Sequence, residues 1–194
     1  MTDKPRPIGP IVEVAGLDGA GKTSVVAAVA AELGWDARKF HPFTTGFHEQ
    51  LSSIRDRLGQ RHVDAARSMA MGLCVLRELS TVTRPTVYDR HLESALMWWS
   101  VMDLCPLPEP LVSELPHPDL VIVLDIDPEA AMKRMLGSRM ESAEIMRWFS
   151  GRCAEYLRRY GPGKGWTMLD ASRPLDVVIR HALEVVRNWL ECRS

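Results

Sequence analysis

Long apolar runs are missing from the sequence. No stretch approaches the roughly 20 apolar residues that span a bilayer, and residues 1–10 hold three prolines but no apolar core of signal-peptide length. Cysteine is also scarce: Cys74, Cys105, Cys153 and Cys192 are widely separated and form no CxxC pair, which argues against a zinc site or a disulfide framework. We therefore expect a cytoplasmic protein that does not enter a membrane and keeps its thiols reduced.

An excess of either charge is missing as well. Lys and Arg number 24, Asp and Glu number 25, and the formal charge of -1 does not favour a nucleic-acid partner. Hydrophobic residues make up 46% and charged residues 25% of the chain, which is ordinary for globular proteins and sufficient for a sizeable core. The length of 194 residues suits one domain, which we expect to cover residues 1–194.

Strand-like and helix-like segments alternate along the chain. Short apolar runs predict strands at 11–15, 86–89, 120–124 and 166–169, and a weaker pattern predicts another at 37–40. Apolar residues at helical spacing predict helices at 22–33, 64–79, 93–103, 144–160 and 175–190, with a further helix starting at Pro128. This alternation predicts an α/β fold in which a parallel sheet carries helices on both faces.

The most specific motif is GLDGAGKT at residues 16–23, a complete G-x-x-x-x-G-K-[ST] pattern between a predicted strand and a predicted helix. Glycines let backbone N–H groups turn toward phosphate oxygens, and a helix N-terminus favours negative charge. Lys22 can reach the β- and γ-phosphates, and the Thr23 hydroxyl can hold Mg²⁺. The motif therefore predicts ATP and Mg²⁺ as cofactors, bound by Gly16, Leu17, Asp18, Gly19, Ala20, Gly21, Lys22, Thr23 and Ser24.

A second motif, Asp89-Arg90, ends the predicted strand at 86–89. The carboxyl ends of parallel strands share one edge of a sheet, so we expect this motif near the phosphate loop. A carboxylate there can hold Mg²⁺ directly or through water, and a guanidinium can bind a phosphate with two hydrogen bonds. We predict that Asp89 is a catalytic metal ligand and that Arg90 serves the acceptor.

A third signal is a basic stretch around Gly137, made of Lys133, Arg134, Arg139 and Arg147. In phosphoryl transfer, movable cations that close over the phosphates neutralise developing charge and exclude water. We predict that Arg134 and Arg139 have this catalytic role. The alternative is that these cations are solvated on helix faces.

These motifs, in this order and at these spacings, resemble the thymidylate kinases along nearly the whole chain. The resemblance also rests on Ala65-Ala66-Arg67, on Ser94, and on the segments 118–125, 133–134 and 169–175. It implies a P-loop NTPase fold with a five-stranded parallel sheet flanked by helices, and a lid near residues 135–147. Members of the family frequently dimerise through helices, so the resemblance leaves a homodimer as one possibility for this chain.

The resemblance also assigns roles by position. It implies that Asp18 faces the 3′-hydroxyl of the acceptor sugar, that Arg90 binds the acceptor phosphate, and that Arg67 contacts the base. Phe43 and Trp98 are further candidates for binding the acceptor. Arg134 and Arg139 correspond to lid cations near the ATP phosphates, and Ser172 and Arg173 lie where the family wraps adenine.

The acceptor half departs from the family pattern. Residues 41–46 read HPFTTG where the family has Arg-Glu-Pro-Gly-Gly-Thr, so an arginine that helps hold the acceptor is missing; His41 or Arg38 is a candidate substitute. Val63 stands where an aromatic ring stacks on thymine, and losing such a ring costs about 1–3 kcal/mol. Trp98-Trp99 replaces a Tyr-Gln type pair, so Trp98 either stacks from another wall or belongs to the core.

From this pattern we predict an ATP-dependent kinase whose acceptor is a nucleoside monophosphate, either dTMP or a modified pyrimidine deoxynucleotide. Two alternatives stay open: a P-loop kinase of another small metabolite, and a nucleotide-dependent regulatory protein that has lost efficient transfer. The intact residues Lys22, Thr23, Asp89 and Arg90 argue against the regulatory protein.

Overall fold

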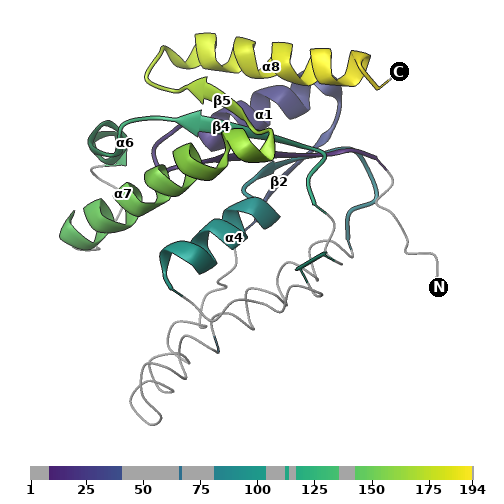
Figure 1. Ribbon diagram of the computed structural model, residues 1–194. Coiled ribbons are helices and arrows are strands. Elements are labelled where there is room, and N and C mark those ends of the chain that lie inside the picture. Colours follow the sequence, from purple (N-terminus) through teal and green to yellow (C-terminus); the bar gives the residue numbers. More distant parts are fainter. Residues whose placement is uncertain are drawn as a thin grey trace.

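The computed structural model describes residues 9–40, 66, 81–103, 112–113, 117–135 and 143–193 (Figure 1). The strands are β1 (Ile11–Gly16), β2 (Asp36–Lys39), β3 (Thr86–Asp89), β4 (Leu120–Asp125) and β5 (Thr167–Asp170). The helices with described bounds are α1 (Lys22–Leu33), α4 (Leu92–Val101), α6 (Pro128–Met135), α7 (Ala143–Tyr160) and α8 (Leu175–Glu191), and a 3₁₀ turn, η1, spans Pro162–Lys164. The predicted alternation of strands and helices is confirmed.

The five strands form one sheet in the order β2-β3-β1-β4-β5, and every pairing is parallel. β1 therefore lies at the centre, between β3 and β4. Parallel pairing brings all the carboxyl ends to one edge, which is the edge where α6 lies in Figure 1. The α/β class and the five-stranded parallel sheet of a P-loop NTPase fold are confirmed.

Helices α1 and α8 cover one face of the sheet, and α4 and α7 cover the other (Figure 1). Because both faces are covered, central strands read as nearly continuous apolar runs. All six residues of β1 are buried, and Glu13 is the one charged residue among them. Helix α1 ends where Gly34 adopts a left-handed conformation with φ 66° and donates its N–H to Ala30.

Some boundaries differ from those predicted. β2 begins and ends one residue earlier than the predicted 37–40, because Asp36 already pairs with Thr86 in β3. The predicted helix at 64–79 lies outside the described residues except for Ala66, which is helical. The predicted lid is described at both ends, but its residues 136–142 lie outside the described part. A membrane span requires a long apolar helix. Among the described helices, none is long and apolar enough to cross a bilayer.

Candidate functional site

The phosphate loop connects β1 to α1 at the carboxyl edge of the sheet. Gly21 is the N-cap of α1 in a left-handed conformation, φ 95°, and no side chain caps this helix, so its first N–H groups are available to an anion. Gly19, with φ 84°, packs against α6: a Cβ there would lie 2.3 Å from the carbonyl oxygen of Ala131. Of the other residues predicted here, Leu17 and Ala20 are buried in the core and Ser24 is exposed on α1.

Lys22 opens α1 and is almost completely buried. Its Nζ donates to the Leu17 carbonyl oxygen at 2.7 Å and lies 3.7 Å from Oδ1 of Asp18. Burial, aided by the nearby Arg90, lowers the pKa of Lys22 to about 7, although the Asp18 carboxylate opposes the shift. A phosphate in the loop would add negative charge beside Lys22 and favour its protonated form.

Thr23 and Asp89 join α1 to the end of β3. The Thr23 hydroxyl donates to Oδ2 of Asp89 at 2.5 Å. Asp89 is 2% exposed, and its Oδ1 has no hydrogen-bond partner among the described residues. A buried carboxylate oxygen without a partner is costly, whereas hydroxyl and carboxylate oxygens are ligands that Mg²⁺ prefers. The two side chains therefore fit a magnesium site.

The protein would supply only part of the magnesium coordination. In the described part of the chain, no group of three or more His, Cys, Asp or Glu side chains is placed to hold a metal ion. Mg²⁺ in phosphate-transfer sites commonly takes one or two protein ligands and completes its shell with waters and substrate phosphates. Thr23 and Asp89 match that sparse arrangement.

Arg90 follows β3 in a left-handed conformation, φ 67°, which is uncommon for a residue other than glycine. Its N–H donates to the Val14 carbonyl oxygen at 3.2 Å, and its Nη2 donates to Oδ1 of Asp18 at 2.6 Å. Its Cζ lies 5.1 Å from the centre of the Trp98 ring, within the range of a cation–π interaction. The structure thus brings together three residues that the sequence assigned to the acceptor side: Asp18, Arg90 and Trp98.

Lys39 is a site residue that the sequence analysis missed. It ends β2, its side chain is 56% exposed, and its Nζ lies 3.9 Å from Oδ2 of Asp89. The guanidinium of Arg38, which was a candidate substitute for the missing arginine, donates instead to the hydroxyl and the carbonyl oxygen of Thr81, at 2.7 and 3.1 Å. Consecutive strand residues point to opposite faces, but in a four-residue strand with one hydrophobic residue the sequence does not show which of the two cations faces the site.

Arg134 lies beside the segment predicted to wrap adenine. Its Nη1 donates to the Ala171 carbonyl oxygen at 3.1 Å. Ser172 donates to Oδ1 of Asp170 from its N–H at 3.0 Å and from its hydroxyl at 2.5 Å, and Arg173 donates to Oδ2 at 3.4 Å. The hydrogen bonds from Ser172 lower the pKa of Asp170. The turn after β5 is therefore ordered by its own side chains and contacts α6.

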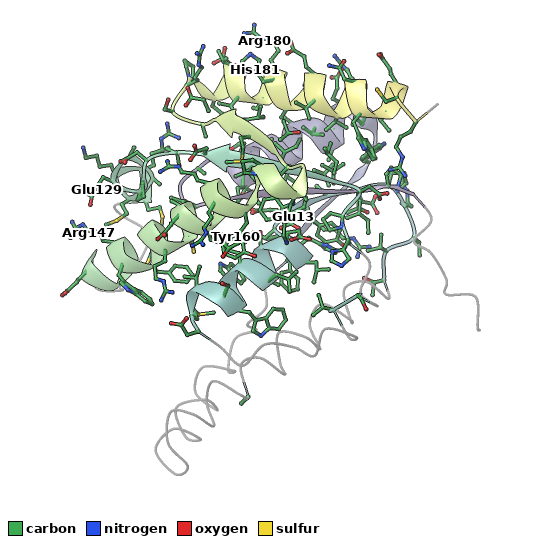
Figure 2. All side chains as sticks on the ribbon, in the orientation of Figure 1. Glu13, Glu129, Arg147, Tyr160, Arg180 and His181 are labelled. Atoms are coloured by element: carbon green, nitrogen blue, oxygen red, sulfur yellow. The ribbon has the colours of Figure 1, made fainter. Side chains whose placement is uncertain are left out.

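Helices α6 and α7, whose facing ends fall within the predicted lid, are joined by an exposed ion pair. Nε of Arg147 donates to Oε1 of Glu129 at 2.6 Å (Figure 2). Three predicted site residues, Arg139, Phe43 and Arg67, lie outside the described residues.

The family model and the curated relatives that match the chain carry the same description. The family model described as thymidylate kinase matches residues 14–181. The chain is 28% identical over 186 residues to a probable thymidylate kinase of Pyrobaculum calidifontis, with 91% of this chain and 95% of that protein covered. It is 25% identical over 199 residues to a thymidylate kinase of Coprothermobacter proteolyticus, with 91% of this chain and 98% of that protein covered.

Solved structures support the fold. A deoxyadenosine kinase from M. mycoides with bound dATP superposes with a TM-score of 0.66 at 16% identity, covering 93% of this chain and 98% of that chain. The same enzyme with products dCMP and dCDP superposes with a TM-score of 0.61 at 16% identity, covering 95% of this chain and 100% of that chain.

Proposed function

The chain belongs to the thymidylate kinase family, and from this we propose that it transfers the γ-phosphoryl group of ATP to a nucleoside monophosphate, with dTMP or a modified pyrimidine deoxynucleotide as acceptor. The observation that carries the proposal is the contact between two sets of residues at one sheet edge. Lys22 and Thr23 belong to the phosphate-loop motif, whereas Asp89 ends β3 and Arg90 comes directly after it. Hydrogen bonds join the motif to Asp89 through Thr23 and to Arg90 through Asp18. Such a site can hold two phosphorylated substrates side by side.

On the ATP side, the loop N–H groups would bind the phosphates and Lys22 would contact the transferred group. Thr23 and Asp89 would hold Mg²⁺, which would supply positive charge that neutralises the ATP phosphates during transfer. Ser172 and Arg173 are proposed to border adenine, and Arg134 and Arg139 are proposed to face the ATP phosphates. The hydrogen bond from Arg134 to Ala171 supports a site that continues from the loop to the turn after β5.

On the acceptor side, Arg90 would bind the acceptor phosphate, because a guanidinium can donate two parallel hydrogen bonds to phosphate oxygens. Lys39 is proposed as a second cation for this phosphate, since it is half exposed and already lies at Asp89. Trp98 would help to hold the Arg90 guanidinium in place through their cation–π contact. Asp18 is proposed to face the sugar hydroxyl, Arg67 the base, and Phe43 the same acceptor pocket.

The reaction would be an in-line transfer. An oxygen of the acceptor phosphate attacks the γ-phosphorus of ATP, the bond from that phosphorus to the bridging oxygen breaks, and ADP leaves with the bridging oxygen. Little covalent chemistry is asked of the protein, so positioning and charge neutralisation by Lys22, Arg90 and the lid cations supply most of the rate. We propose that one domain, spanning residues 1–194, carries all these parts.

The experiment that tests this proposal is a screen of ADP release with ATP, Mg²⁺ and a panel of nucleoside monophosphates, nucleosides and sugar phosphates. We expect pyrimidine deoxynucleoside monophosphates to give the fastest release, with little release from the unphosphorylated nucleosides. Lys22→Ala is the control for contaminating kinases and should abolish the signal. Fast release only with a sugar phosphate would replace the proposal with a kinase of another small metabolite, and no release with any acceptor would favour a regulatory protein.

A further inference from the structure

Glu13 is an ionisable residue in the middle of β1 and is completely buried. It lies three residues before Gly16, the first residue of the phosphate-loop motif. Strand alternation turns its side chain to the face opposite that of Val12, and Figure 2 shows it beside the beginning of α4. A buried carboxylate is costly unless strong hydrogen bonds compensate for its lost hydration. The partners of Glu13 therefore indicate what it does.

Helix α4 begins in the protein interior. Its N-cap, His91, makes no side-chain cap hydrogen bond. The first-turn residues Leu92 and Ser94 have no exposed surface. The first N–H groups of a helix have no acceptor within the helix, and buried N–H groups without an acceptor destabilise a fold. The start of α4 therefore requires an acceptor from elsewhere in the chain.

Glu13 supplies that acceptor with both oxygens of its carboxylate. Oε2 accepts from the Glu93 N–H at 3.0 Å, and Oε1 accepts from the Ser94 N–H at 2.8 Å. An N-cap side chain makes this kind of contact, but here it comes from a strand 80 residues earlier in the chain. Negative charge is also favourable at a helix N-terminus. Burial raises the pKa of Glu13, whereas its hydrogen bonds with Ser94 lower it.

The part of α4 that Glu13 holds is directly linked to the acceptor side of the site. Arg90 stands two residues before Leu92, the first residue of α4, and its N–H donates to Val14, the neighbour of Glu13, at 3.2 Å. Trp98 lies on α4 with its ring 5.1 Å from the Arg90 guanidinium. A shift of α4 relative to β1 would therefore move Trp98 against Arg90.

We propose that Glu13 is a positioning residue for the acceptor. By fixing the start of α4 to the strand that leads into the phosphate loop, it sets the place of Arg90 and Trp98 relative to the ATP phosphates. This inference rests on the proposed function, because its main effect is expected on acceptor binding. The Glu93 side chain anchors the same turn on its outer side, accepting from Nζ of Lys164 at 2.6 Å and contacting Nδ1 of His117 at 3.1 Å.

The first arm of the test measures the anchor itself, without any substrate. Amide hydrogen exchange followed by NMR should show slow exchange of the Glu93 and Ser94 amides in the wild-type protein. The Asp176 amide in the first turn of α8, a helix that also has no side-chain cap, is the internal reference and should exchange faster. Exchange of all three amides at one rate would overturn the proposal.

The second arm uses variants. Glu13→Gln keeps the size of the side chain but turns an amide NH₂ toward one N–H donor, while Glu13→Asp keeps the charge on a shorter chain. We expect both variants to speed amide exchange at Glu93 and Ser94 and to lower kcat/KM for the acceptor, by about tenfold in Glu13→Gln. KM for ATP should stay within about twofold of the wild-type value. Val12→Ala is the matched control in the same strand, and it should lower stability while leaving both KM values unchanged.

The outcomes separate the two claims. If Glu13→Gln changes only the thermal midpoint, or raises KM for ATP as much as KM for the acceptor, Glu13 has a general structural role and the inference is wrong. If neither variant folds, the exchange rates of the wild-type protein still test whether Glu13 holds the Glu93 and Ser94 amides. If the wild-type protein transfers phosphate to no nucleoside monophosphate, the proposed function fails, whereas the exchange arm still reports on Glu13.

Discussion

Nη2 of Arg90 and Oδ1 of Asp18 are 2.6 Å apart, so the cation proposed to bind the acceptor phosphate is paired with a carboxylate of the phosphate loop. Asp18 also lies 3.7 Å from Nζ of Lys22. One carboxylate therefore contacts both the cation proposed for ATP and the cation proposed for the acceptor. A phosphate that approaches either cation would compete with Asp18, so we expect the binding of the two substrates to be coupled.

Arg90→Ala should lower kcat/KM for the monophosphate acceptor by about 100-fold, because charged hydrogen bonds worth about 3 kcal/mol are lost. The value of kcat/KM for the unphosphorylated nucleoside should fall much less, so the difference in kcat/KM between the two acceptors should become smaller. Steady-state kinetics with both acceptors provide the measurement. Arg152→Ala, which removes a guanidinium from a surface ion pair with Asp103, is the control and should change neither value. Equal losses on both acceptors would show that Arg90 does not bind the phosphate.

Asp89→Asn should raise the Mg²⁺ concentration for half-maximal activity by about tenfold, since a neutral amide is a poorer ligand for a hard cation than a carboxylate. The amide matches the carboxyl group in size, so the thermal midpoint should change little. A Mg²⁺ titration of ADP release at saturating ATP checks the expectation. Asp103→Asn, at an exposed position, is the control. An unchanged Mg²⁺ requirement in Asp89→Asn would contradict the metal role.

Lys39→Met should raise KM for the acceptor by about fivefold and leave KM for ATP unchanged, because Met keeps the apolar stem and removes only the charge proposed for the acceptor phosphate. The effect should shrink in high salt, since Lys39 is half exposed. The adjacent Arg38→Met provides a matched control, because Arg38 binds Thr81. If both variants change KM for the acceptor equally, the loss is a general charge effect.

Cys153 and Cys192 should differ in reactivity. Burial raises the pKa of the Cys153 thiol to about 12, so almost none of it is thiolate at pH 8, and the thiolate is the nucleophile. Cys192 is exposed. Alkylation by iodoacetamide at pH 8, followed by peptide mass spectrometry, should label Cys192 at once and Cys153 only when the protein is unfolded. Rapid labelling of Cys153 in the folded protein would contradict this expectation and show that the core beneath α7 opens readily to solvent.

The sequence was sufficient for features that depend on neighbouring residues. The strand at 11–15, the phosphate-loop pattern and the strand ending at Asp89 were all predicted from local patterns, and the structure has β1 at Ile11–Gly16 and β3 at Thr86–Asp89. Apolar runs and glycine spacing report burial and turns directly. The shared carboxyl edge followed from parallel topology alone.

Contacts between distant residues were beyond the sequence. The pairing of Asp18 with Arg90 spans 72 residues, and it exists because β1 and β3 became neighbours, which no local pattern specifies. In the sequence, Glu13 only interrupts an apolar strand. Its role becomes visible in the structure, where the start of α4 lies beside it. Lys39 was overlooked beside Arg38 because the faces of a four-residue strand with one hydrophobic residue carry little periodic signal.

The fit of Gly19 against Ala131 makes the phosphate loop and α6 a steric stop for each other. A single added methyl group at position 19 would lie 2.3 Å from the Ala131 carbonyl oxygen, a separation that non-bonded atoms do not reach. The nucleotide-binding loop and α6 can therefore pack directly against each other only because position 19 has no side chain.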